Sequence, residues 1–90
     1  MDYNRDRLSN LLIRTKVTHS DLARLVDVSR VTVYNWLTGG TPHRLIASKL
    51  TAVLAALEAA EAAGQLPVVE RRRDERTALL QDIVAAHIKQ

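Results

Sequence analysis

The sequence predicts an all-α fold, a small helical bundle that 90 residues can form as one compact domain. Two helix-capping residues, Thr18 and Ser29, stand eleven positions apart and indicate two short helices in succession. Leucine, isoleucine, valine and alanine recur every three or four residues around them, and only three aromatic residues are present. Glycine and proline interrupt this pattern at residues 39–42 and 64–67, which separates the later helices.

The first three helices are expected in the N-terminal half of the chain. Residues 5–14 carry three leucines at helical spacing and predict a first helix that packs on the next two. Thr18 and Asp21 match a capping box, and Asp21 also lies at the positive end of the helix dipole. With the second cap, the sequence predicts helices over residues 19–26 and 30–38, joined by a short turn.

A longer fourth helix is expected after the glycine pair. Gly39 and Gly40 end the third helix, because glycine adopts the left-handed cap conformation at little cost. The fourth helix is predicted over residues 42–63, with Thr41 as its cap and Pro42 at its first position, where the missing N–H costs nothing. Its apolar residues alternate by steps of four and three, a spacing typical of coiled coils: Ile46, Leu50, Val53, Leu57 and Ala60.

Gly64 and Pro67 mark the break before the last segment. The predicted division is a domain of residues 1–63, a linker of residues 64–69 and a C-terminal amphipathic helix of residues 70–90. Such a helix needs a cover for its apolar face, so it either folds back and closes the core or pairs with a second copy of the chain. We favour pairing, through six apolar residues: Leu57, Leu79, Leu80, Ile83, Val84 and Ile88.

The third helix has two distinct faces. At about 100° per residue, Val33, Trp36 and Leu37 share one side, which must be buried. Val31 and Asn35 point the opposite way. An exposed valine gains nothing in water, but it can contact the methyl group of a thymine. A polar outer face is also what any amphipathic surface helix would have.

Residues 18–39, T-H-S-D-L-A-R-L-V-D-V-S-R-V-T-V-Y-N-W-L-T-G, resemble the helix-turn-helix of the lambda-repressor/Cro-type (XRE-like) DNA-binding family. The family pattern is T-Q-x-x-L-A, three residues, G-V-S, three residues, I-S-x-W-E-x-G. It is matched at Thr18, Leu22, Ala23, Val28, Ser29, Trp36 and Gly39, with Val33 for the isoleucine. The resemblance covers residues 5–57 and implies a lambda-repressor-like bundle of four helices plus a C-terminal helix.

Four positions depart from the family pattern. His19 replaces a glutamine that contacts a phosphate; histidine can also donate to phosphate, with a strength that depends on pH. Asp27 replaces the turn glycine, and aspartate tolerates a positive φ better than most residues. Tyr34 and Leu37 stand where the family has serine and glutamate.

The resemblance implies that the chain binds double-stranded DNA through two groups of residues. Base edges in the major groove would be contacted by Arg30, Val31, Thr32 and Asn35. The sugar–phosphate backbone would be contacted by His19, Tyr34, Thr38, His43 and Arg44. For His43, an exposed loop position without a role is an equally good interpretation.

The charge distribution agrees with a DNA-facing surface in the first two thirds of the chain. Residues 1–57 hold eight basic and four acidic groups, and residues 28–57 hold no acid, whereas residues 58–90 hold five basic and six acidic groups. Phosphate attracts lysine and arginine and repels carboxylates. The later arginines alternate with acids and are expected to pair within their own helix: Arg71, Arg72, Arg73 and Arg76.

Several classes of protein are disfavoured. The chain has no cysteine, so disulfides and thiolate metal sites are excluded, and no cofactor or metal site is expected. No histidine pair, carboxylate pair or phosphate-binding loop suggests an enzyme. No apolar run approaches the roughly 20 residues that cross a bilayer. A cytoplasmic protein without a membrane partner is the expectation.

Three functions stay open on the sequence alone. The first is a phage, plasmid or antitoxin type repressor or activator that binds an inverted-repeat operator as a homodimer. The second is a DNA-packaging or replication-recruitment protein that forms a larger oligomer. The third is a protein-binding module without DNA contact, against which the outward Arg30, Val31 and Asn35 argue. If the last helix dimerises, truncation at Gly64 should leave a folded domain with weaker DNA binding.

Overall fold

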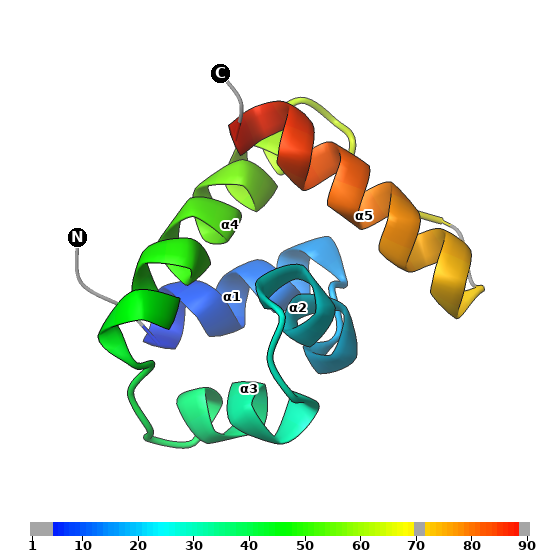
Figure 1. The fold of residues 1–90 in the computed structure, drawn as a ribbon. Helices are drawn as coiled ribbons and strands as arrows, with labels where there is room; N and C mark the ends of the chain where they lie inside the picture. Colours follow the sequence, from blue (N-terminus) through cyan, green and yellow to red (C-terminus); the bar gives the residue numbers. More distant parts are fainter. Residues whose placement is uncertain (1–4, 70–71, 89–90) are drawn as a thin grey trace.

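A computed structural model describes residues 5–69 and 72–88 of the chain (Figure 1). These residues form five helices and no strand, which confirms the all-α prediction. The helices are α1 (Arg5–Thr15), α2 (His19–Val26), α3 (Arg30–Leu37), α4 (Arg44–Ala62) and α5 (Arg73–Ile88). The outermost residues of the predicted N-terminal domain and C-terminal helix, 1–4, 70–71 and 89–90, lie outside the described residues.

Both predicted caps of the helix-turn-helix are present. The Thr18 hydroxyl accepts from the backbone N–H of Asp21, and the Asp21 carboxylate accepts from the N–H of Thr18, each at 3.0 Å. The Ser29 hydroxyl accepts from the N–H of Thr32 at 3.1 Å. Asp27 ends α2 in the left-handed conformation with φ 62°, as expected for the residue in the family's glycine position. The turn between α2 and α3 is therefore held by local interactions.

The connection from α3 to α4 differs in part from the prediction. Gly39 has φ 124°, and a Cβ on Gly40 would lie 2.9 Å from the carbonyl oxygen of Asn35, so both positions favour glycine. The fourth helix, however, does not begin at Pro42. It begins at Arg44. His43 caps it, because its Nδ1 atom accepts a hydrogen bond from the backbone N–H of Leu45 at 3.3 Å. Pro42 lies before the helix, and its ring is buried.

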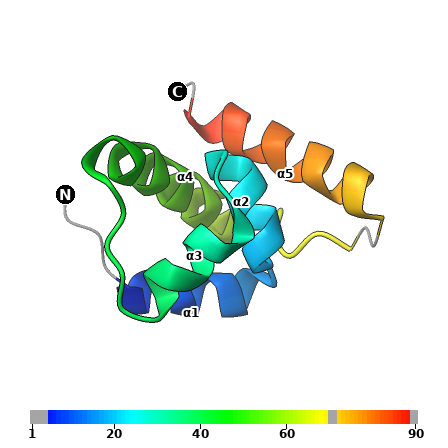
Figure 2. The same cartoon turned by 60° about the horizontal axis from the view of Figure 1, so that its bottom comes forward.

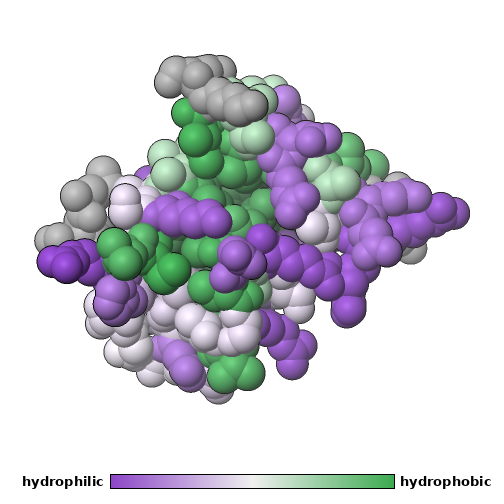
Figure 3. Space-filling model, viewed as in Figure 1, coloured by the Kyte–Doolittle hydropathy of each residue, from purple (hydrophilic) through white to green (hydrophobic). Residues whose placement is uncertain are grey.

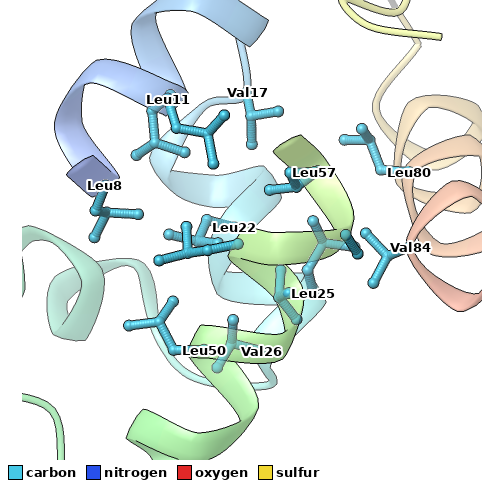
Figure 4. Packing of buried hydrophobic residues seen from close by; sticks show 14 of the residues in the cluster. Leu8, Leu11, Val17, Leu22, Leu25, Val26, Leu50, Leu57, Leu80 and Val84 are labelled. Atoms are coloured by element: carbon cyan, nitrogen blue, oxygen red, sulfur yellow. The ribbon is translucent and has the colours of Figure 1, made fainter. Parts of the chain in front are cut away.

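All five helices contribute to one hydrophobic core (Figure 4). α5 packs against α4 and α2, and α1 packs against α4 and α3. Each helix supplies at least one side chain that is at most 1% exposed: Leu8, Leu11, Leu22, Val26, Val33, Leu50, Val53, Leu57 and Leu80. Leu66, from the predicted linker, is also buried in this core. None of the helices in the described ranges combines the length and hydropathy needed to cross a membrane.

The structure corrects half of the predicted dimer contact. Leu57 and Leu80 are fully buried and Val84 is 6% exposed within a single chain, so the expectation that they meet a partner is wrong. Leu80 and Val84 of α5 pack toward α2 and α4, which carries Leu57, and so close the core, the alternative role of the last helix (Figure 4). The physical reason is that α4 and α2 leave an apolar face that α5 covers, and covering it within one chain needs no second molecule. Leu79 and Ile88 stay exposed, at 43% and 47%.

Two ion pairs link α1 to α4. Arg7 Nε donates to the Glu58 carboxylate at 3.0 Å, and a second nitrogen of Arg7 also contacts it. Arg14 Nε lies 3.1 Å from the Glu61 carboxylate on a more exposed part of the same seam. The hydrogen bond from Arg7 lowers the pKa of Glu58 below its ordinary value of 4.5, against a smaller opposing effect of burial. The ionised form of Glu58 is therefore favoured by the folded state.

This lowered pKa predicts a pH-dependent contribution to stability. Because the pKa of Glu58 is lower in the folded than in the unfolded chain, the stabilisation is complete above the unfolded value and is lost as pH falls through the folded value. Glu58→Gln should cost about 0.2–1 kcal/mol at neutral pH, the range of partly exposed pairs. Urea unfolding of the wild type and of Glu58→Gln at a series of acidic pH values should show the difference in their free energies of unfolding disappear. A difference that stays constant down to strongly acidic pH would contradict this prediction.

The arginine-rich segment at the start of α5 follows the prediction only in part. Arg72 pairs with Glu75 at 3.0 Å, an i,i+3 contact of the expected kind. Arg76 reaches beyond its own helix, and its guanidinium contacts the carboxylate of Asp21 in α2 at 2.7 Å. Arg71 lies outside the described residues. Strongly hydrophilic residues gather over this end of α5 in the space-filling view (Figure 3).

Candidate nucleic-acid interface

A groove of about 840 Å³ runs between α3, the start of α2 and the end of α1. His19, the first residue of α2, lies on one side of it, and Arg30, Val31 and Tyr34 lie along α3 on the other. The structure thus brings together four of the nine residues that the sequence assigns to DNA contacts. Figure 2 shows α3 with its outer side free of other helices.

The two faces of α3 are confirmed. Val33 is fully buried and Trp36 is 4% exposed, so they anchor the helix to the core. On the outer face, Val31 is 65% exposed, and Arg30 and Asn35 are also exposed. An apolar side chain and two hydrogen-bonding side chains on one accessible helix face suit the edges of base pairs in a major groove.

Thr32 is less accessible than the other predicted base contacts. It is half-buried, and its hydroxyl lies 2.8 Å from the hydroxyl of Ser29. Its backbone N–H also donates to the Ser29 hydroxyl. Thr32 therefore takes part in the cap of α3, which positions Arg30 and Val31 at the first turn of the helix.

The start of α2 is suited to an anion. The first N–H groups of a helix lack partners within it and carry partial positive charge, which favours phosphate. His19 is exposed at this end and adds a ring donor. The capping box satisfies the N–H of Asp21 and leaves the earlier N–H groups, of His19 and Ser20, at the edge of the groove.

The remaining predicted backbone contacts lie beyond the other end of α3. Thr38 is exposed, and its hydroxyl donates to the carbonyl of Tyr34 at 3.0 Å. His43 uses Nδ1 to accept from the N–H of Leu45, so Nε2 is the ring nitrogen left for another contact. Arg44 is exposed beside it. His19 and Tyr34 line the groove, whereas Thr38, His43 and Arg44 do not, so the structure separates the predicted backbone contacts into two groups.

The structure adds Ile13 to the candidate surface, a residue that the sequence interpretation missed. Ile13 is 72% exposed and lines the groove from α1. A signal was available, because Ile13 lies off the face that carries Leu8, Leu11 and Leu12, all of which are buried. Its proximity to α3, however, depends on how the two helices pack.

The charged side chains of α3 and of the first two turns of α4 are all positive. Arg30, Arg44 and Lys49 are exposed, and residues 28–57 contain no acid. Asp27 is the exposed acid next to this region in the sequence, at the turn before α3. The surface over α3 mixes apolar and hydrophilic residues, as Figure 3 shows. Across residues 5–69 and 72–88, no group of three histidine, aspartate or glutamate side chains is placed to hold a metal ion.

Two short helices joined by a tight turn, with the second exposed along a basic and partly apolar face, define a helix-turn-helix DNA-binding domain. The sequence model of the Cro/C1-type HTH DNA-binding domain matches residues 7–60, more than half of the chain. The protein therefore belongs to the Cro/C1-type helix-turn-helix family, which confirms the resemblance noted from the sequence. No curated protein and no solved structure matches this sequence.

Proposed function

We propose that the protein is a cytoplasmic transcriptional regulator, a repressor or activator that binds an inverted-repeat operator in double-stranded DNA as a homodimer. The observation that carries the proposal is the outward face of α3, where Val31 is 65% exposed beside Arg30 at the edge of the groove that begins at His19. In this arrangement α3 lies in the major groove and the start of α2 meets a phosphate of the same duplex. Val31 contacts a thymine methyl, and Arg30 and Asn35 donate to base edges.

Arg30→Ala tests base contact directly. If Arg30 donates to a guanine, its loss should cost about 1–3 kcal/mol of specific binding and should relax the preference at one base pair. A selection of bound sequences from a random duplex pool would identify the operator, and fluorescence anisotropy would then compare affinities.

Arg73→Ala is the matched control for this test, because Arg73 is an exposed arginine on α5, away from α3 in both ribbon views (Figures 1 and 2). It removes the same charge but should leave the base preference unchanged. A folded Arg30→Ala protein with the operator affinity of the wild type would remove Arg30 from the set of base contacts.

The proposed homodimer uses the part of α5 that the core leaves exposed. A groove of about 770 Å³ is lined by Pro67, Val68, Val69, Leu79 and Ile83, with Gln65 and Arg72 at its sides. Val69 is 93% and Leu79 43% exposed in this groove, so two apolar side chains there are open to a partner. We propose a second copy of the chain as its occupant, because α5 lies on the far side of the molecule from α3 (Figure 1). Pairing there leaves both recognition helices free to meet one DNA duplex.

Leu79→Glu should therefore produce a monomer that still folds, since Leu79 is 43% exposed in the single chain. Mass in solution and operator affinity are the measurements, and we expect lower affinity for the inverted repeat with single half-site binding retained. Gln81→Glu is the control: it adds the same charge at an exposed position on the other side of α5. If Leu79→Glu remains a dimer, the dimer contact lies elsewhere on the molecule. If the wild type forms a ring with weak base preference, the DNA-packaging alternative is favoured.

A further inference from the structure

The C-terminal helix contacts the DNA-facing end of α2 through one side chain. Arg76 of α5 donates from Nε to the Asp21 carboxylate at 2.7 Å, and the two side chains are 16% and 5% exposed. Asp21 is the acid of the capping box and lies in the first turn of α2, two residues after His19. The pair joins residues that are 55 positions apart in the sequence.

Arg76 also holds two backbone segments, one before α2 and one before α5. Its other nitrogens donate to the backbone carbonyl of Lys16, in the connection from α1, and to that of Val68, before α5. Lys16 itself has φ 56°, so this connection turns sharply just before the cap. A second tie runs from Arg24 of α2 to the Thr77 hydroxyl of α5 at 2.9 Å. Arg76 thus adds to the cap at the start of α2, and the bond from Arg24 ties the last turn of α2 to α5.

The charge of Asp21 makes this contact relevant to DNA binding. The Asp21 carboxylate lies in the first turn of α2 and repels a phosphate bound at that end of the helix, because both groups are negatively charged. Arg76 neutralises the buried carboxylate of Asp21 and donates a hydrogen bond to it. The first N–H groups of α2 and the ring of His19 can then bind a phosphate without this repulsion. With 16% of its side chain exposed, Arg76 acts through Asp21.

We propose that Arg76 is a positioning residue for DNA binding: α5 sets the position and the net charge of the phosphate-binding end of α2. The proposal rests on the proposed function, in which DNA lies against α3 and His19. It gives α5 a second role beside closing the core.

The test compares Arg76→Gln, Asp21→Asn and the double variant in the full chain, by fluorescence anisotropy on the selected operator. Arg76→Gln should bind on the order of tenfold more weakly, and its defect should shrink as salt is added, because screening weakens the repulsion. The double variant should recover most of the affinity, since asparagine still accepts the Thr18 N–H but carries no charge. Arg76→Lys, which keeps the charge, should lie between wild type and Arg76→Gln.

Circular dichroism would verify folding at the temperature of each binding measurement. If Arg76→Gln does not fold, the double variant carries the test, because it buries no unpaired charge. A folded double variant that binds about tenfold more weakly than wild type would overturn the proposal, and so would a folded Arg76→Gln with wild-type affinity. Failure of the wild-type chain to bind any selected duplex would instead overturn the proposed function.

Discussion

Trp36→Ala is expected to destabilise the protein by about 3–5 kcal/mol, the cost of truncating a large buried aromatic side chain. Trp36 is 4% exposed, and with Val33 it is one of two buried residues of the eight-residue helix α3. The cavity therefore opens beneath the helix that faces DNA. Urea unfolding followed by circular dichroism would measure the loss.

Tyr34→Ala is the matched control for this substitution, because it removes an aromatic residue from the same helix at a position that is 55% exposed. Its effect on stability should be within about 0.5 kcal/mol, while its operator affinity should fall if Tyr34 contacts the DNA backbone. A Trp36→Ala protein that melts like the wild type would show that the inner face of α3 has been assigned wrongly.

Truncation after Gly64 is expected to unfold the domain or leave it without fixed packing. The deletion removes the buried Leu66, Leu80 and Val84 and exposes the faces of α2 and α4 that α5 covers. It also removes Arg76, the ion-pair partner of Asp21. This outcome is opposite to the expectation from the sequence alone, in which residues 1–63 fold without the last helix.

A graded form of this prediction uses single substitutions in α5. Leu80→Ala should cost about 2–5 kcal/mol because Leu80 is fully buried. Leu79→Ala, at the next position and 43% exposed, should cost far less. If the truncated chain unfolds cooperatively with the same Tm as the wild type, α5 is dispensable for the fold and this prediction is wrong.

The helix-turn-helix could be predicted closely because its signals are local. The cap of α2 joins residues three positions apart, as does the cap of α3, and Asp27 accepts a left-handed conformation through its own backbone preference. The inner face of α3 follows from helical periodicity, which also placed Val31 outside. Interactions of this range need no knowledge of the rest of the fold.

The start of α4 was harder to predict, since two caps compete within three residues. Thr41 before Pro42 is a regular helix start, yet His43 caps the helix and Pro42 is buried. The choice depends on whether the proline ring gains more by packing in the interior than by opening a helix. That balance is set by the neighbouring side chains in space.

Local spacing and residue chemistry were enough to establish the helices, the two capped starts and the outward face of α3. The tertiary structure alone decided where the faces of α5 go: Leu80 and Val84 into the core, Leu79 to the surface, and Arg76 to Asp21. An amphipathic helix carries the same pattern whether it covers its own chain or a second copy. Only the shape and charge of the surface that it meets distinguish the two, and that surface is assembled from residues far away in the sequence.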